Sequence, residues 1–204
     1  YTLEAQARRV GAVLDSLHIS SATFVAHNVG SSVVLRLALA RPSLVRGLVS
    51  IEGGVAESAG TPGLRRALSL AGFLGHFGLE SVAMSKMRSK MRDSSGDPSW
   101  ITDPVMAAYM APLKDQYQDA ITAYKAMASA PERVALAPRL ARVKVPVELL
   151  VGTAEHDGGI GPDELGIMRS RLSGLSIVPV AGAGHWIQEE RPQAVIEAVR
   201  KLAG

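Results

Sequence analysis

The sequence predicts an α/β fold in which a parallel sheet carries helices on both faces and a helical cap is inserted. Short apolar runs rich in β-branched residues alternate with helical patterns, as is typical of βαβ units. Residues 55 to 138 break this alternation, because they are rich in Met, Ser and Gly and contain no clear strand pattern. The predicted domains are therefore a core of residues 1 to 54 and 139 to 204 and a cap of residues 55 to 138.

The first part of the core has the pattern of a helix, a strand, a second helix and a second strand. Apolar residues recur at helical spacing over about residues 2 to 17. The run ATFVAH, at residues 22 to 27, predicts a strand, and the helix that starts from Gly30 is stopped by Pro42. The run VRGLVSIEGG predicts the second strand, which ends in a glycine turn.

The second part of the core contains two more strands. Residues 139 to 152 contain a short helix and then the strand VELLVG, which Pro146 opens. The run SIVPVA, at residues 176 to 181, predicts the fourth strand, and a last helix is expected over about residues 190 to 203. Strands that alternate with helices in this way form a parallel sheet.

The composition indicates a globular protein, since 47% of the residues are hydrophobic and 20% are charged. No stretch approaches the roughly 20 apolar residues of a membrane span. The 22 Lys and Arg are scattered among 19 Asp and Glu, so a nucleic-acid partner is not expected. Because the chain has no Cys, disulfides and thiol chemistry are excluded, and redox chemistry does not reveal the compartment. The cytoplasm is taken as the default location.

The segment TFVAHNVGSSV, at residues 23 to 33, joins a predicted strand to a predicted helix. Ala26 and Gly30 are small enough for the strand and the helix to approach each other at a tight turn. Hydrolases use such a turn to present a nucleophile, but here its centre is Asn28. A carboxamide has a delocalised lone pair and no proton that a histidine can remove near neutral pH. Covalent catalysis at Asn28 is therefore expected to be lost or very slow.

Two later loops carry further residues with catalytic chemistry. Asp157 follows the strand VELLVG in GTAEHDGGIGP, and His185 follows the last strand in GAGHWIQEERP. The order of Asn28, Asp157 and His185 resembles the order of nucleophile, acid and histidine in the α/β-hydrolase superfamily. The resemblance covers nearly all of the chain and implies the C-terminal part of an α/β-hydrolase fold. Glu155 and Asp163 lie in the same loop as Asp157 but fit the family position less well.

The resemblance also implies a role for each residue of the site. Asn28 holds the nucleophile position, Asp157 is the acid, His185 is the base, and the backbone N–H of Val29 is an oxyanion donor. Glu52, which ends the strand in VSIEGG, is the alternative acid, because some dehalogenase-like relatives place their acid there. Glu52 is equally well interpreted as a strand-end carboxylate that is bonded to backbone N–H groups.

The other histidines are expected to have no catalytic role. His27 competes with His185 through its place beside the turn, but it resembles a family histidine that buttresses the turn. His18, His76 and His156 lack partners at metal-site spacing, so surface or cap positions are expected for them. Neither a metal nor a cofactor is therefore expected.

Several serines could be mistaken for a replacement nucleophile. Ser58 and Ser69 stand near small residues, but neither directly follows a strand and opens a helix, so chance explains the pattern. Ser31 and Ser32 lie inside the helix after the turn, where structural roles are expected.

The predicted cap contributes Tyr109, Tyr117 and Tyr124. The epoxide-hydrolase branch of the superfamily uses cap tyrosines to polarise an epoxide oxygen, which the resemblance extends to these residues. Aromatic cap residues also simply line or close a pocket. Because Pro112 interrupts the segment, a single helix is not expected to present all three side chains.

The resulting functional hypothesis is a hydrolase of carboxylic esters that acts on a small apolar substrate, with its covalent step lost or weak because of Asn28. One alternative is an epoxide hydrolase or a haloalkane dehalogenase-like enzyme in which Asn replaces Asp. Another is a non-catalytic binder or receptor for a small molecule. A third is non-covalent catalysis by a His185–Asp157 pair.

The superfamily carries strands and an oxyanion loop before the helix that opens this chain, and the sequence contains neither. The run ATFVAH is therefore expected to form an edge strand, which is a liability when it is apolar. We expect another segment or another subunit to complete the sheet.

Overall fold

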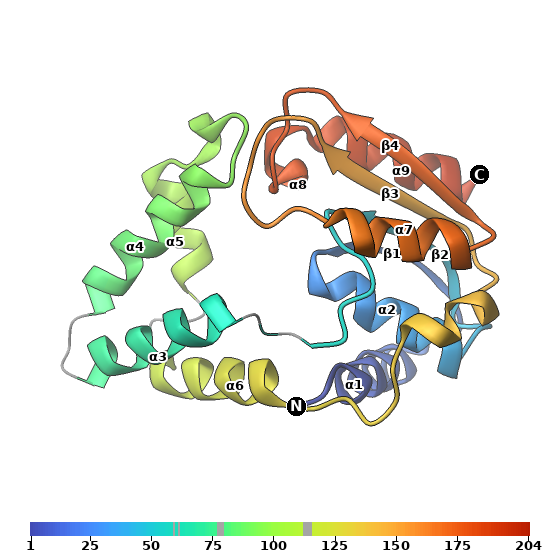
Figure 1. Cartoon of the computed structure of the whole chain (residues 1–204), viewed down its shortest axis with the longest axis horizontal. Coiled ribbons are helices and arrows are strands. Elements are labelled where there is room, and N and C mark those ends of the chain that lie inside the picture. Colours follow the sequence, from blue (N-terminus) through green and yellow to red (C-terminus); the bar gives the residue numbers. More distant parts are fainter. Residues whose placement is uncertain (59, 61, 77–79, 112–115) are drawn as a thin grey trace.

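Figure 1 shows the chain in a computed structural model that describes residues 1–58, 60, 62–76, 80–111 and 116–204. Within these residues, four strands form one sheet in the order β1-β2-β3-β4, and each neighbouring pair is parallel. The predicted parallel sheet is thereby confirmed. The strands are β1 (Ala22–His27), β2 (Val45–Ile51), β3 (Val147–Gly152) and β4 (Leu175–Val180).

The register of the strands brings their carboxyl ends to one edge of the sheet. His27 of β1 is opposite Ile51 of β2, and Ile51 is opposite Leu150 of β3. The backbone N–H of Asn28 donates to the carbonyl oxygen of Ile51 at 2.9 Å, which extends the ladder to the turn. The residues that directly follow the strands therefore lie together, which is where α/β sheets bind their ligands.

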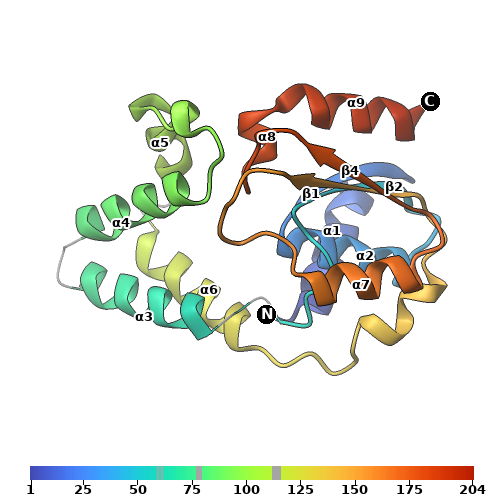
Figure 2. The ribbon, with the colours of Figure 1, turned by 45° about the horizontal axis from the view of Figure 1, so that its top comes forward.

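Helices cover both faces of the sheet, as predicted (Figure 2). Leu48 and Val49 are neighbours in β2 but belong to separate hydrophobic clusters, because successive side chains of a strand point to opposite faces. The face of Leu48 is covered by α1 (Leu3–Ser16), α2 (Val29–Ala40), the short η3 (Ala137–Arg142) and α7 (Pro162–Arg171), and that of Val49 by α8 (Ile187–Glu190) and α9 (Pro192–Ala203).

A helical region lies between β2 and β3 in the sequence and beside the sheet in space (Figures 1 and 2). Its described residues contain no strand, as predicted. None of the described helices combines the length and the apolar character needed to cross a membrane. The region consists of α3 (Pro62–His76), α4 (Glu80–Asp93), η1 (Pro98–Trp100), α5 (Asp103–Met110) and α6 (Tyr117–Ser129).

Arg36 of α2 joins the core to the two segments that lead into and out of the helical region. Its fully buried side chain donates to the carbonyl oxygen of Ala56 and forms an ion pair with Glu57 at 3.2 Å. Glu57 in turn accepts from the backbone N–H of Leu136, on the return segment, at 2.7 Å. One buried guanidinium and its carboxylate partner thus hold both connections together.

Helix α7 was not predicted, because its segment has Gly166 near the centre and no clear apolar stripe. In the structure, Pro162 stands in the first turn together with Asp163 and Glu164, and all three residue types favour a helix start. Met168 is fully buried in the core. Tertiary packing of Met168 thus stabilises a helix that local propensity alone does not predict.

Strand β1 lies at the edge of the sheet, as the sequence predicted. Among the described residues it pairs with β2 alone. Val25, in the middle of β1, is 48% exposed. One side of this strand therefore offers backbone groups and apolar surface for pairing.

Candidate active site

Asn28 lies at the tip of the turn between β1 and α2. Its backbone has φ 51° and ψ −124°, a strained conformation for a residue other than glycine. The loop after β2 approaches this turn so closely that a Cβ atom at Gly53 would lie 2.2 Å from the carbonyl oxygen of Asn28. The turn therefore requires glycine at position 53, and it leaves Asn28 exposed at the edge of the sheet.

His185 faces Asn28 across this edge. The Nδ2 atom of Asn28 and the Nε2 atom of His185 are 3.1 Å apart. A carboxamide nitrogen only donates, so in this arrangement Nε2 accepts and the neutral ring carries its proton on Nδ1. Burial and, to a lesser extent, the nearby His27 and His156 together lower the pKa of His185 to about 3. The imidazole is therefore neutral at pH 7 and can accept a proton.

Backbone contacts on both sides hold His185 in place. Its N–H donates to the carbonyl oxygen of Ser94 at 2.8 Å. Its own carbonyl oxygen accepts from Nε2 of His27 at 2.9 Å. Burial lowers the pKa of His27, so that ring is neutral as well. His27 thus connects the turn at Asn28 to the segment that contains His185, which agrees with the predicted role of supporting the turn.

Glu190 is a positioning residue that the sequence analysis did not single out. Its buried carboxylate accepts from the backbone N–H groups of Gly184 at 3.1 Å, Trp186 at 3.2 Å and Asp97 at 2.8 Å. These bonds fix the chain on both sides of His185 and join it to the segment after α4. The available signal was its place in GAGHWIQEERP, the segment that contributes His185 to the family resemblance.

Glu52 directly follows β2, and its side chain is buried at the same edge of the sheet. Its backbone lies in the left-handed region, with φ 46°. The carboxylate accepts from the backbone N–H groups of Gly152 and Ile160, the latter at 3.2 Å. These bonds confirm one of the two interpretations, a strand-end carboxylate bonded to backbone N–H groups. The role of an acid partner for His185 stays a prediction.

Asp157 lies on the loop after β3, but its carboxylate is directed to the helical region. It forms an ion pair with Lys90 of α4, which lowers the pKa of Asp157. Within the described residues, its hydrogen bonds and ion pairs do not include His185. A Cβ atom at Gly158 would lie 3.5 Å from the His185 ring, so the loop is close even though the carboxylate points elsewhere.

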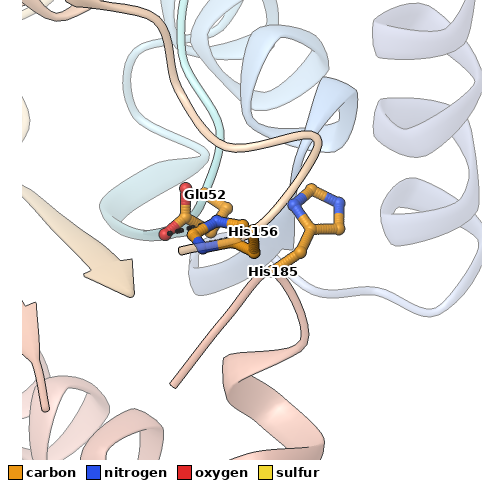
Figure 3. A group of neighbouring side chains, drawn as sticks. All are labelled: Glu52, His156 and His185. Carbon is orange, nitrogen blue, oxygen red and sulfur yellow. Dashed lines mark ion pairs between the residues drawn. The ribbon is translucent and has the colours of Figure 1, made fainter. Parts of the chain in front are cut away.

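His156 is not at the surface, and the expectation of a surface or cap position for it was wrong. Its side chain is only 7% exposed, because the loop after β3 folds back over Glu52. Its Nε2 atom lies 3.7 Å from Oε1 of Glu52, as the dashed line in Figure 3 marks. Glu52, His156 and His185 each offer one ligand atom within 4.8 Å of the other two.

The remaining candidates have the following places. His18 is exposed after α1, as expected, whereas the side chain of His76 lies outside the described residues. Ser31 and Ser32 are buried and donate to the carbonyl oxygens of Ala26 and Gly54 respectively, which agrees with structural roles. Ser58 and Ser69 do not open a helix after a strand; Ser58 lies in a loop and Ser69 lies inside α3.

The three tyrosines of the helical region have separate partners. Tyr109 donates to Glu189 at 2.6 Å and packs edge-on against Trp186, which is next to His185. The Tyr117 hydroxyl donates to the carbonyl oxygen of Ala71 at 3.2 Å. Tyr124 lines an open pocket of about 450 Å³ between α1 and α6. The contacts of Tyr109 thus lead to the segment that contains His185.

Val29 is the first residue of α2, so its backbone N–H is one of the helix-terminal donors that have no acceptor within the helix. Such a donor next to the nucleophile position suits a developing negative charge. The assignment of Val29 as an oxyanion donor stays a prediction.

The chain belongs to the alpha/beta hydrolase family, because the sequence profile of that family matches residues 1–198. The expected family and fold are thereby confirmed. No curated protein sequence matches the chain.

Solved structures with the same fold have several activities. An N-acyl homoserine lactone degrading enzyme aligns with a TM-score of 0.69 and 20% identity, over 98% of this chain and 74% of that one. The meta-cleavage product hydrolase CumD from Pseudomonas fluorescens aligns with a TM-score of 0.74 and 16% identity, over 99% and 71%. A haloalkane dehalogenase variant from Bradyrhizobium elkanii aligns with a TM-score of 0.67 and 22% identity, over 100% and 74%. Identities this low establish the common fold and not a substrate.

Proposed function

We propose that this chain is a small-molecule hydrolase of the type that uses an Asp nucleophile on epoxides or haloalkanes, with its covalent step blocked by Asn28. The observation that carries the proposal is the grouping of Asn28, His185 and Glu52 at one edge of the sheet. In such an enzyme a carboxylate attacks a substrate carbon, displaces the epoxide oxygen or the halide, and forms an alkyl ester. Water that has lost a proton to the histidine then hydrolyses the ester.

The shape of Asn28 supports an Asp-type reaction. A carboxamide and a carboxylate have the same number of heavy atoms in the same planar arrangement. After Asn28→Asp, a carboxylate oxygen would occupy the place of Nδ2, which is 3.1 Å from Nε2 of His185. The heavy atoms of nucleophile and base would then need no rearrangement, and because a carboxylate only accepts, the ring proton of His185 would move to Nε2.

The position of Glu52 supports the same branch of the family, since dehalogenase-like relatives place their acid after this strand. Glu52 and His185 are both buried, and a carboxylate oxygen of Glu52 lies within 4.8 Å of a ring nitrogen of His185. Hydrogen bonds in active sites are often long before substrate binds, so this separation suits an acid that orients the Nδ1–H group. Asp157, the acid expected from chain order, forms an ion pair with Lys90 instead.

We propose that the helical region, residues 55 to 138, acts as a cap over the site. Three contacts support this role: Ser94 accepts from the backbone of His185, Lys90 pairs with Asp157, and Tyr109 donates to Glu189. The rings of Trp100, Tyr109 and Trp186 pack together beside His185. This apolar surface suits a small apolar substrate.

We also propose that a further strand, from another segment or another subunit, pairs with the free edge of β1. Two observations support this: Val25 is exposed, and one side of β1 has no strand beside it among the described residues. A second oxyanion donor to complement Val29 would come from the same added part. Size-exclusion chromatography combined with intact-mass measurement would contradict the proposal if this chain alone were a well-folded monomer.

The experiment compares the hydrolysis of a simple epoxide, a short haloalkane and a short aryl ester by the unaltered protein and by Asn28→Asp and Asn28→Ser, each with the proposed additional segment or subunit supplied. We expect weak or absent turnover by the unaltered protein and rescue by Asn28→Asp on the epoxide or the haloalkane. With Asn28→Asp, mass spectrometry of the quenched reaction should show an alkyl ester on the peptide that contains position 28.

The other outcomes decide between the alternatives. Rescue by Asn28→Ser on the aryl ester would contradict the Asp-type assignment and identify an esterase. Rescue by neither variant would contradict both and indicate a small-molecule binder. Turnover by the unaltered protein that is lost in His185→Gln would indicate non-covalent, histidine-based catalysis. The variant His18→Asn, at an exposed position, is the matched control for handling and folding.

A further inference from the structure

We propose that Glu52, His156 and His185 form a binding site for a divalent transition-metal cation, for which Zn²⁺ is the best fit. The three residues come from the loops after β2, β3 and β4 and gather in one place (Figure 3). One ligand atom of each lies within 4.8 Å of those of the other two. Two imidazoles and one carboxylate are a set that Zn²⁺ takes in proteins.

His156 is already prepared to bind a cation. Its Nδ1 atom lies 2.7 Å from the carbonyl oxygen of Ala154, so Nδ1 carries the proton and donates it. The lone pair is therefore on Nε2, which is buried and has no hydrogen-bond partner among the described residues. Metal-binding histidines are held in the same way, with the distal N–H donated to a carbonyl oxygen.

His185 contributes the second nitrogen. Its Nε2 atom is engaged by Asn28, whereas its Nδ1 atom is buried and without a hydrogen-bond partner in the described part of the chain. Coordination through Nδ1 places the ring proton on Nε2, which then needs an acceptor. A half-turn of the Asn28 amide supplies one, because Oδ1 then takes the place of Nδ2. Asn28 can thus serve both tautomers of His185.

The ligand atoms lie within 4.8 Å of one another and have to move closer together around the cation. Ligand atoms of a tetrahedral zinc site are about 3.3 Å apart, as bond lengths of about 2.0–2.1 Å require. Nε2 of His156 and Oε1 of Glu52 are 3.7 Å apart, so this pair is nearly in place. The carboxylate of Glu52 is oriented by the backbone N–H groups of Gly152 and Ile160. Three protein ligands leave the fourth position to water.

Nε2 of His156 and Nδ1 of His185 are buried without hydrogen-bond partners within the described residues, which is costly. A shared cation would satisfy both nitrogen atoms together with the carboxylate. The binding site itself does not depend on the proposed hydrolase function. If that function holds, the cation would occupy Nδ1 of His185 and compete with the acid–base role of this residue.

The first test is calorimetric titration of ZnCl₂ at pH 7.5 into the protein after removal of metal with a chelator. We expect one Zn²⁺ per chain, with binding at least ~10-fold weaker in Glu52→Gln and in His156→Gln. His18→Asn replaces an exposed histidine whose φ of 57° asparagine tolerates, so it should bind as the unaltered protein does. No stoichiometric binding, or equal affinity in all four proteins, would overturn the proposal.

The second test uses only the unaltered protein, so it does not depend on how the variants fold. Co²⁺ is added during NMR observation of the histidine rings, and the resonances of His156 and His185 should broaden before those of His18. Equal broadening of all three would overturn the proposal. Neither test uses a substrate, so failure of Asn28→Asp to restore hydrolysis would leave these outcomes unchanged.

Discussion

The ends of β2 and β3 each bring a carboxylate to the active-site edge of the sheet, and the two carboxylates have opposite surroundings. Glu52 is 2% exposed and accepts two backbone hydrogen bonds. The Asp157 side chain is 70% exposed and pairs with Lys90. Both loops lie where chain order predicts an acid, so chain order does not decide which carboxylate turns inward. In the structure, Glu52 has a left-handed backbone and Asp157 is paired with Lys90.

The largest effect that separates the two carboxylates is expected in catalysis. In the Asn28→Asp background, Glu52→Gln should lower kcat roughly 10³- to 10⁴-fold, because His185 would lose the group that orients it. Asp157→Asn should change kcat by less than about 5-fold, since it removes only an exposed ion pair. Steady-state kinetics on the rescued substrate measures both. Equal losses, or a larger loss in Asp157→Asn, would reverse the assignment.

The contrast between a buried and an exposed ionic contact extends to stability. Arg36→Met should lower the free energy of unfolding by about 3 kcal/mol, because the buried carboxylate of Glu132 loses the guanidinium charge 3.9 Å away and, among the described residues, keeps only its backbone donors. Arg41→Met breaks the exposed pair with Asp15 and should have a much smaller effect. Urea unfolding measures the change in the free energy of unfolding for both variants. Equal changes would contradict the claim that burial makes the Arg36 contacts more stabilising.

The pH dependence of stability tests the burial of His185. Its folded pKa, about 3, is below its ordinary value of 6.5. Between these values the unfolded chain binds a proton that the folded chain does not, so the free energy of unfolding should fall as pH drops from about 6.5 towards 3. This fall should be shallower in His185→Gln and unchanged in His18→Asn. An identical pH profile in His185→Gln would contradict the assigned burial.

The smallest effect is expected at the exposed carboxylate. Lys90→Ala should raise the pKa of Asp157 towards its ordinary value of 3.8, because the hydrogen bond and the charge of Lys90 are the largest causes that lower it, ahead of the charge of His156. The stability that this pair adds is present above pH 3.8 and is lost as pH falls through the lowered value. An NMR titration of the Asp157 carboxyl group measures the shift. An unchanged pKa would show that Lys90 is not its partner in solution.

Much of the core could be predicted from the sequence, because local patterns determine it. The strand ATFVAH was placed at its observed bounds, Ala22–His27, and the turn at Asn28 followed from the small residues beside it. The Gly-interrupted α7 could not be predicted, since tertiary burial of Met168 stabilises it.

The grouping of side chains was harder to predict than the fold. Glu52 and His156 are 104 residues apart, so no sequence spacing connects them, and only the parallel register of β2 and β3 brings them together. The outward direction of Asp157 depends on Lys90, a residue of the helical region whose position relative to the core has no local sequence signal.

The most direct test of the account is a long-range nitrogen–proton NMR spectrum of the His185 ring at pH 7 in metal-free protein. We predict a neutral ring with its proton on Nδ1, whose resonance moves in Glu52→Gln and stays in place in Asp157→Asn. A charged ring, or a resonance that moves in Asp157→Asn and not in Glu52→Gln, would contradict the claim that Glu52 is the acid that faces His185.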